Sequence, residues 1–522
     1  MSTAPVDAEF VNPAAVIVLA AGEGTRMKSR TPKVLHTLCG RPLLGHAVAA
    51  AREVNPDRLV VVVGHGRDQV VEYLAEADPA VRPVVQEVQN GTGHAVRVAM
   101  DALAGSDGEP NSDPNGHLNG ELDGTVLVIF GDSPLLTGAT LARLTVEHQR
   151  TGNAVTVLTA NVPDPTGYGR MLRGADGAVL GTVEQKDATP EQRAITEVNS
   201  GVLAYDAKLL RFGLSQLTTS NAQGEEYLTD VLGILAKAGH PVGAQVVPDY
   251  HEVLGVNDRV QLAELRRIMN ERLTTHWMRE GVSIIDPATT WIDVQVQLER
   301  DVVIHPNTQL HGATVIAEGA EIGPNCTLTD TVVGAEAHVT NATTVGAEIG
   351  PQATVGPYTY LREGTKLGRK AKAGGFVEMK KAVVGDGSKV PHLSYVGDAE
   401  IGVGCNIGAG TITANYDGVN KHRTSIGDHV FVGTNTVLVA PAQIADGAFV
   451  AAGSSIVLPV GPGALAVARG RQRNIEGYIE SRRPNTPAAA AAKAARERRA
   501  GQAADDRQVN TDRPSSEQPS AG

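Results

Sequence analysis

Residues 304–328 read IHPNTQLHGATVIAEGAEIGPNCTL, and an aliphatic side chain returns at every sixth position. The positions that share this spacing are Ile304, Leu310, Ile316, Ile322 and Leu328. Two later runs keep the same period, one from Ile349 to Leu367 and one from Ile426 to Ile456. A hexapeptide repeat is typical of a parallel β-helix, in which each short strand turns one aliphatic side chain inward. The sequence therefore predicts this fold from about Val282 onward.

Two segments interrupt the predicted repeat, Arg369–Lys381 and Asn415–Thr424. A stacked coil has no internal room for inserted residues, so we expect both segments to project outward as loops. After Arg483 the chain is rich in Ala, Pro, Ser, Gln and charged residues. This composition predicts a mostly disordered extension that contains a short Ala-rich helix.

The N-terminal half has a different pattern. Apolar, β-branched runs alternate with helix-like stretches such as His94–Ala104, and these runs are Val16–Leu19, Leu59–Val63, Val126–Phe130 and Val155–Leu158. Continuous apolar strands between helices predict a mostly parallel α/β sheet that is covered on both faces. A polar stretch at residues 105–121 is interpreted as a surface insertion.

A helix is predicted between the two halves, at Asp258–Glu280. Its aliphatic side chains recur at helical spacing, at Leu262, Leu265, Ile268, Met269 and Leu273. The predicted organisation is a flexible N-terminus (1–13), an α/β domain (14–257), a linker helix (258–281), a β-helix (282–473) and a C-terminal extension (474–522).

The composition restricts partners and location. A net charge of −12 argues against bulk attraction to nucleic acid or to an anionic membrane. The three cysteines, Cys39, Cys326 and Cys405, lie far apart and form no Cys-x-x-Cys pattern. This argues against a disulfide framework or a zinc finger and suits a reducing cytoplasm. No segment has the uninterrupted run of about 18 apolar residues that a membrane helix needs.

The first candidate site follows the strand Val16–Leu19. A glycine-rich turn, AAGEGTRM at residues 20–27, is followed by Lys33. Such a turn lets backbone N–H groups approach phosphate oxygens, and Arg26 and Lys33 add positive charge. Asp132 follows the strand Val126–Phe130, at the sheet edge where α/β folds bind ligands. It is a candidate Mg²⁺ ligand, although a turn role is the alternative.

These motifs resemble a known family. LAAGEGTRM (19–27) with Pro32-Lys33 resembles the sugar-nucleotide pyrophosphorylases. Further motifs follow in the order that this family uses: Gln86, NGTGHA (90–95), GDSPL (131–135), GYGR (167–170), EQKD (184–187) and EVNSG (197–201). Together with the β-helix, the chain resembles the bifunctional N-acetylglucosamine-1-phosphate uridyltransferase and glucosamine-1-phosphate N-acetyltransferase family. The resemblance extends from Ala14 to about Arg473.

For the N-terminal half, the resemblance implies a Rossmann-like nucleotidyltransferase domain with Mg²⁺ held by Asp132 and Asn257. Without the resemblance, Asn257 could equally be a helix cap beside Asp258. Phe130 stands where some relatives carry Tyr. The implied residues that bind UTP and UDP-N-acetylglucosamine are Ala20, Ala21, Gly22, Arg26, Lys33, Gln86, Gly91, Thr92, Asp132, Gly169, Glu184, Asn199 and Asn257.

The second candidate site lies on the predicted β-helix. Cations at Arg362 and Lys380 could bind a phosphate. The segment KVPHLSYVGD (389–398) contains His392, whose side chain type titrates near neutral pH and suits a general base. A lone histidine is nevertheless more often structural.

By the resemblance, His392 is the general base of acetyl transfer and the β-helix is left-handed. Glucosamine phosphate would contact Arg362, Lys380, Tyr395 and Asn406. Acetyl-CoA would contact Ala409, Asn415, Tyr416, Thr434, Ala452 and Arg469. Thr434 replaces the serine that is more usual at its position.

The implied function is a two-site cytoplasmic enzyme that makes UDP-N-acetylglucosamine for cell-wall precursors from acetyl-CoA, UTP and sugar phosphates. The implied assembly is a homotrimer whose acetyltransferase sites lie between neighbouring β-helices. One alternative is a single-activity sugar-1-phosphate nucleotidyltransferase with a structural or regulatory β-helix, and Glu378–Lys381 and His392–Asp398 argue against it. Another is a non-enzymatic trimeric scaffold with decayed sites. The intact set of Arg26, Lys33, Asp132 and Asn257 argues against it.

Overall fold

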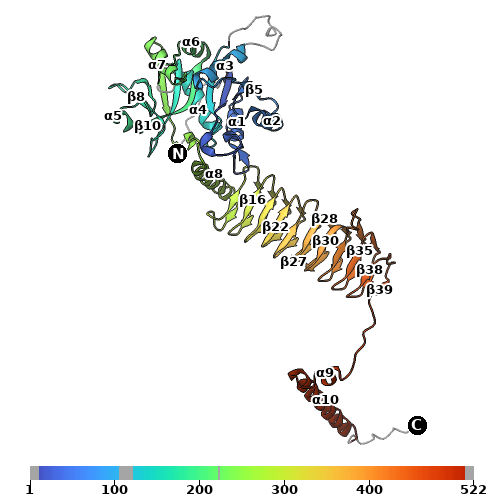
Figure 1. Cartoon of the computed structure of the whole chain (residues 1–522). Coiled ribbons are helices and arrows are strands. Elements are labelled where there is room, and N and C mark those ends of the chain that lie inside the picture. Colours follow the sequence, from blue (N-terminus) through green and yellow to red (C-terminus); the bar gives the residue numbers. More distant parts are fainter. Residues whose placement is uncertain (1–10, 105–121, 222–223, 512–522) are drawn as a thin grey trace, which may run out of the picture.

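The structure is a computed structural model that describes residues 11–104, 122–221 and 224–511. An α/β domain, a long helix, a β-helix and a pair of C-terminal helices follow one another along the chain (Figure 1). The expected surface insertion at residues 105–121 lies outside the described residues.

The sheet of the α/β domain has the strand order β11-β7-β10-β6-β1-β4-β5, and β8 and β9 extend it beside β10. Strands β1, β4, β5 and β6 are parallel, as are β7 and β11, whereas β10 runs antiparallel to β6 and β7. The predicted mostly parallel sheet is therefore confirmed, although β10 runs antiparallel to its neighbours and β8 and β9 are antiparallel to each other. The bounds are β1 Ala15–Ala20, β4 Leu59–Val63, β5 Arg82–Val85, β6 Thr125–Phe130, β7 Val155–Asn161, β8 Gly169–Arg173, β9 Val179–Val183, β10 Glu197–Asp206 and β11 Val242–Val246.

Helices cover both faces of this sheet. Val16 and Val18 of β1 pack with α1, α2 and α4, whereas Ile17 and Leu19 pack with α3, α6 and α7. Successive side chains of a strand point to opposite faces, so β1 contributes to two cores. The helices are α1 Leu43–Glu53, α2 Arg67–Ala77, α3 Thr92–Ala104, α4 Gly138–Thr151, α5 Pro190–Arg193, α6 Ala207–Ser215 and α7 Asp230–Lys237.

The predicted linker helix is α8, Arg259–Arg279, and its N-cap is Asp258. Its buried face carries Leu262, Leu265 and Ile268, which confirms the amphipathic pattern. The buried Asn270 joins the helix to the start of the β-helix. Its Nδ2 donates to the Thr290 carbonyl at 2.7 Å, and its Oδ1 accepts from the Ile292 N–H at 3.0 Å.

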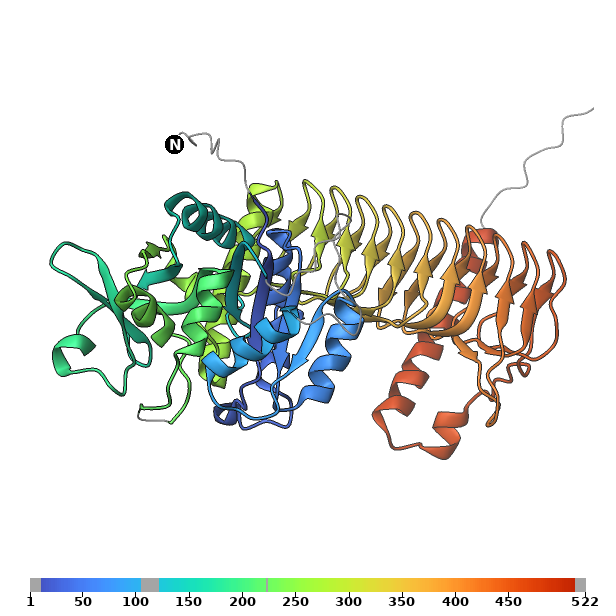
Figure 2. The same ribbon diagram turned by 90° about the horizontal axis from the view of Figure 1, so that it is seen from above.

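Short parallel strands build the left-handed β-helix, from β12 (Ser283–Ile284) to β39 (Leu465–Ala466). Its coils stack in a row (Figure 2). Every hexapeptide position predicted to face inward is buried. The strands around the second candidate site are β25 Thr359–Leu361, β26 Lys366–Leu367, β27 Lys372–Gly375, β28 Glu378–Val384, β29 Lys389–His392, β30 Tyr395–Ile401, β31 Asn406–Ile407, β32 Ile412–Ala414 and β33 Thr424–Ile426.

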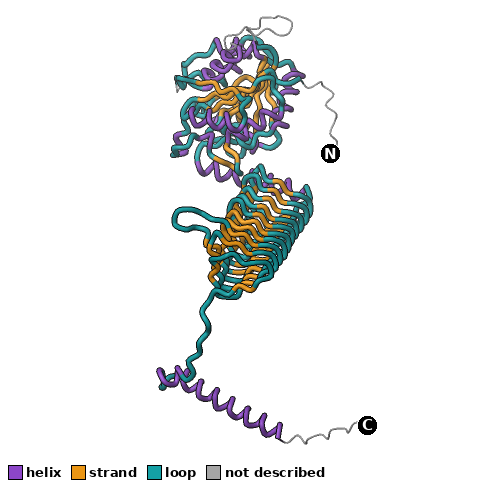
Figure 3. Tube along the Cα trace, turned by 90° about the vertical axis from the view of Figure 1, so that its right-hand side faces the viewer, coloured by secondary structure: helices purple, strands orange, loops and turns teal. Residues whose placement is uncertain are grey.

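The predicted outward loop at Arg369–Lys381 is wrong, because β27 and β28 run through this segment. Ala373 and Met379 continue the six-residue period from Leu367, and all three are buried. The small Ala and the flexible Met occupy inward positions that the prediction reserved for branched aliphatic residues. By contrast, residues 416–421 of the predicted loop Asn415–Thr424 are exposed, and a loop projects from the side of the coils (Figure 3). That prediction is confirmed.

The C-terminal extension holds two helices, α9 (Tyr478–Arg482) and α10 (Pro487–Thr511). The expectation of a mostly disordered segment with only a short helix is wrong for residues 487–511. Alanine and arginine dominate this run, and both have high helix propensity. None of the helices in the described part of the chain is long and apolar enough to cross a membrane.

Candidate active sites

A cavity of about 300 Å³ lies at the carboxyl ends of β1 and β6. It brings together many of the residues predicted for UTP. Its lining includes Ala20, Ala21, Gly22, Lys33, Gln86, Gly91, Thr92, Phe130 and Asp132. Loops after parallel strands meet at this edge of a sheet, so residues far apart in the sequence share one cavity.

The glycine-rich turn leaves its backbone open to a ligand. A side chain at Gly22 would meet no atom within 4 Å, so the backbone here is accessible to phosphate oxygens. Gly24 has a φ of 65°, and a Cβ there would lie 2.5 Å from Cβ of Lys33. The absence of a side chain at Gly24 thus lets Lys33 pack against the turn, where its Nζ forms an ion pair with Asp132.

The two candidate metal ligands lie on adjoining segments. The Val256 N–H donates to the Asp132 carbonyl at 3.0 Å, which brings the neighbouring Asn257 to the Asp132 loop. Arg26 Nη2 donates to Asn257 Oδ1 at 2.9 Å. The helix cap is Asp258, whose carboxylate accepts from the N–H groups of α8, so Asn257 is not the cap. Both side-chain oxygens are of the hard type that Mg²⁺ prefers, and each already faces a cationic side chain.

On the expected uridine side, Gln86 is buried and its Nε2 donates to the Gly91 carbonyl at 3.1 Å. Thr92 accepts from the Leu228 N–H through its hydroxyl at 3.1 Å. Sequence reasoning missed Gln89, which lines the same cavity and donates to the Ala21 carbonyl at 2.7 Å. The sequence signal that could have identified Gln89 is its position directly before the NGTGHA motif. Glu225 also lines the cavity, and no motif marks it.

On the expected sugar side, β8 pairs with β10 so that Gly169 lies opposite Asn199. A Cβ at Gly169 would lie 3.3 Å from Glu184 Oε1, so the structure brings these three predicted residues together. Burial raises the pKa of the Glu184 carboxyl, and the nearby Asp230 and Asp187 add to this shift. The Phe130 ring packs directly over Gly201, where an added Cβ would lie 2.0 Å from the ring.

The phosphate-binding candidates of the β-helix form a cation cluster. Arg362 Nη1 donates to Glu378 Oε1 at 2.9 Å. Lys380 lies beside Lys421, and this contact, together with the charge of Arg362, lowers the pKa of Lys380. Lys421 belongs to the projecting loop. Sequence reasoning missed it because no spacing links it to Lys380.

His392 ends β29 with its side chain exposed, and its backbone pairs with Gly375 of the preceding coil. His392 and Asn406 (β31) belong to the 11-stranded sheet, whereas Lys380 (β28) and Tyr395 (β30) belong to the 17-stranded sheet. The predicted sugar-binding residues of one chain therefore lie on different sheets.

The projecting loop carries the predicted contacts of acetyl-CoA. Asn415 Nδ2 donates to Asp398 Oδ2 at 2.5 Å, and the Tyr416 hydroxyl donates to the Gly418 carbonyl at 2.6 Å. Within the loop, the N–H groups of Asn420 and Val419 and the His422 ring lower the pKa of Asp417 to about 2. These contacts fix the shape of the loop.

The remaining acetyl-CoA candidates follow one edge of the β-helix. The Asn435 N–H donates to the Ala409 carbonyl at 2.7 Å, and the Gly453 N–H donates to the Thr434 carbonyl at 2.8 Å. These bonds place Ala409, Thr434 and Ala452 on successive coils. The exposed Arg469 follows, with its Cδ 3.8 Å from a Cβ built on Gly453.

Comparisons with known proteins agree with this geometry. Residues 16–198 match the MobA-like NTP transferase domain family. The bifunctional protein GlmU of Streptomyces coelicolor is 58% identical over 485 residues, covering 93% of this chain and 98% of that protein. GlmU of Thermobifida fusca is 57% identical over 486 residues, covering 93% and 98%. The chain belongs to the bifunctional GlmU family.

Family membership confirms the resemblance that the sequence motifs indicated. GlmU of Corynebacterium glutamicum, 53% identical over 92% of this chain, shows the same full-length similarity. The nucleotidyltransferase match covers residues 16–198 of the domain that contains the cavity, and the GlmU similarity spans the β-helix as well.

Proposed function

We propose that this chain makes UDP-N-acetylglucosamine in two reactions at two separate sites. The β-helix transfers acetyl from acetyl-CoA to glucosamine-1-phosphate. The α/β domain then joins N-acetylglucosamine-1-phosphate to UTP and releases pyrophosphate. The observation that carries this proposal is the cavity at the sheet edge, which is lined by the Lys33–Asp132 ion pair and the open glycine-rich backbone. The full-length similarity to GlmU proteins supports it.

For uridylyl transfer, the backbone of Ala20–Gly22 with Arg26 and Lys33 binds the triphosphate. Gln86, Gly91 and Thr92 hold the uridine. Asp132 and Asn257 would hold Mg²⁺, which neutralises phosphate charge when bound. Transfers of this kind depend on positioning and charge neutralisation, so the proposal includes no general base here.

The sugar phosphate lies on the side of Gly169, Glu184 and Asn199. One of its phosphate oxygens attacks the α-phosphorus of UTP, a new P–O bond forms, and pyrophosphate leaves. The converging positions of Gly169 and Glu184 support this assignment.

For acetyl transfer, His392 accepts a proton from the sugar amine, which attacks the thioester carbonyl. The C–N bond forms, the C–S bond breaks, and CoA leaves as the thiol. Arg362, Lys380 and Lys421 hold the sugar phosphate, while Tyr395 and Asn406 orient the sugar. Acetyl-CoA lies along the edge from Ala409 to Arg469, beside Asn415 and Tyr416.

We place this site between neighbouring β-helices of a homotrimer. Two observations support this arrangement. His392 and the cation cluster lie on different sheets of one chain, so a second chain would be needed to enclose the substrate. In addition, Tyr358, Phe376 and Leu393, next to His392, expose 61%, 62% and 62% of their surface. Burial of exposed apolar side chains favours association.

The proposed domains are 14–257 for uridylyl transfer, 258–281 for the linker and 282–473 for acetyl transfer. A cytoplasmic location, without nucleic-acid or membrane partners, agrees with three free, buried cysteines and a net charge of −12.

The proposal is tested by giving the protein glucosamine-1-phosphate and acetyl-CoA without UTP and following free CoA thiol. We expect thiol release from the unchanged protein and almost none from His392→Ala. No release from folded, trimeric protein would leave a nucleotidyltransferase with a structural β-helix and would contradict the two-reaction proposal.

A further inference from the structure

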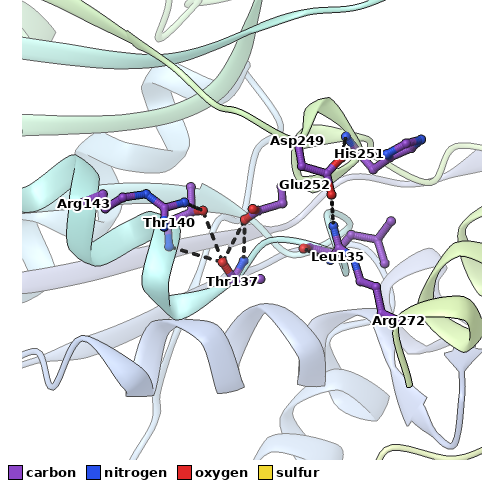
Figure 4. Close-up of polar contacts among 8 residues, drawn as sticks. All are labelled: Leu135, Thr137, Thr140, Arg143, Asp249, His251, Glu252 and Arg272. Atoms are coloured by element: carbon purple, nitrogen blue, oxygen red, sulfur yellow. Dashed lines mark hydrogen bonds and ion pairs between the residues drawn. The ribbon is translucent and has the colours of Figure 1, made fainter. Parts of the chain in front are cut away.

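A polar network joins α8 to the two segments that carry the candidate metal ligands (Figure 4). Arg272 of α8 donates through Nη1 to the Leu135 carbonyl at 2.7 Å and through Nη2 to Asp249 Oδ2 at 2.8 Å. Leu135 lies three residues after Asp132, and Asp249 lies eight residues before Asn257. One guanidinium therefore links the Asp132 segment to the Asn257 segment.

Two further contacts connect the same segments. The Glu252 carboxylate is buried and accepts from the Thr137 hydroxyl at 2.8 Å and from its N–H at 3.2 Å. The Val256 N–H donates to the Asp132 carbonyl at 3.0 Å. The Arg272 contacts add the link from these two segments to α8.

The chemistry of this link requires the forked shape of arginine. A guanidinium presents several N–H groups at fixed angles and can bond two acceptors together, whereas a lysine ammonium on its flexible stem cannot fix both. Arg272 is held at its place, since 29% of its side chain is exposed and both acceptors lie within 2.8 Å. Asp249 is also held by the His251 ring and N–H.

We propose that Arg272 is a positioning residue for uridylyl transfer. It holds the Asp132 loop against the Asn257 segment, so that the two side-chain oxygens, which now face Lys33 and Arg26, would be positioned to share one Mg²⁺. This inference rests on the proposed function, in which these oxygens bind Mg²⁺. It also gives α8 a second role, because Asn270 on the same helix contacts the β-helix.

The test measures retention of Mn²⁺, as a probe for Mg²⁺, by the full-length protein in ultrafiltration at a fixed UTP concentration. We expect Arg272→Gln to weaken Mn²⁺ binding by about 10-fold to 100-fold, the range found when partners of metal ligands are lost. Arg272→Lys should lie between Arg272→Gln and the unchanged protein. The Mg²⁺ concentration for half-maximal uridylyl transfer should rise in parallel.

The matched control is Arg267→Gln on the same helix, because the exposed Arg267 contacts only Glu271 among the contacts that the structure gives it. Thermal unfolding of the same preparations, followed by circular dichroism, reports that the α/β domain is folded, and acetyl transfer reports the same for the β-helix. If Arg272→Gln lowers acetyl transfer as well, Asp249→Asn replaces it as the deciding variant.

The outcomes separate the two proposals. Unchanged Mn²⁺ binding in folded Arg272→Gln, while Asp132→Asn loses binding, would overturn the inference alone. Equal binding by the unchanged protein and Asp132→Asn would overturn the proposed metal role itself. Weakened binding in Arg272→Gln with normal acetyl transfer supports the inference.

Discussion

The α/β domain and the β-helix position functional residues in different ways. In the α/β domain, loops from several strands meet at one sheet edge and surround a cavity of about 300 Å³ within a single chain. In the β-helix, a regular core supports isolated polar side chains, such as His392, on the outside of the coils. The first arrangement gathers its lining residues without a second chain. In the proposed function, the second arrangement is completed by a neighbouring β-helix.

The largest expected effect is on the β-helix reaction alone. His392→Ala should lower the rate of acetyl transfer by about 10²–10⁴-fold, the usual contribution of a general base. Uridylyl transfer, measured as pyrophosphate release, should stay unchanged because none of the contacts among the described residues links His392 to the cavity. Equal losses in both reactions would show that the two regions are not independent.

The next effect concerns the stability of the coils. Ile322→Ala removes a fully buried inward side chain and should lower the free energy of unfolding by about 2–5 kcal/mol. Thermal unfolding followed by circular dichroism measures this. The matched control is Val332→Ala in the same coil, where 48% of the residue is exposed, with an expected change within about 0.5 kcal/mol. Similar losses in both variants would contradict the assigned inward face.

A smaller effect is expected at the cation cluster. Lys421→Ala should raise the KM for glucosamine-1-phosphate by about 10-fold, because a charge-assisted contact to the phosphate is lost. Lys366→Ala is the control, since Lys366 is paired with Glu348 on the surface. An unchanged KM for Lys421→Ala would exclude Lys421 from the proposed phosphate contacts.

The smallest expected effect is a pH dependence of stability in the α/β domain, and it arises at Glu184. Burial raises the pKa of the Glu184 carboxyl. This carboxyl therefore contributes fully to the free energy of unfolding below the ordinary carboxyl pKa. The contribution is lost as the pH rises through the raised pKa. Glu184→Gln has no such titration. Its melting temperature should therefore rise relative to the unchanged protein as pH increases through this window. A constant difference across the window would contradict the burial argument.

Much of the fold could be predicted from sequence because repeats and strands depend on local patterns. Ile304 to Leu328 marks the β-helix core through spacing alone, and Leu59–Val63 is a strand with the predicted bounds. Ala373 and Met379 escaped the prediction because the pattern was sought in branched aliphatic residues. Residues of the candidate uridylyl site could be predicted where one sequence motif contains several of them, as from Ala20 to Lys33. Lys421 and Glu225 were not, because only the folded chain brings them to their sites.

In the proposed function, one chain holds two independent sites. The most direct test supplies glucosamine-1-phosphate, acetyl-CoA, UTP and Mg²⁺ and measures UDP-N-acetylglucosamine made by His392→Ala, by Asp132→Asn and by a mixture of the two proteins. Neither variant alone should make product, and the mixture should restore it, because the acetylated sugar phosphate diffuses from one protein to the other. Product from either variant alone, or none from the mixture, would contradict the claim.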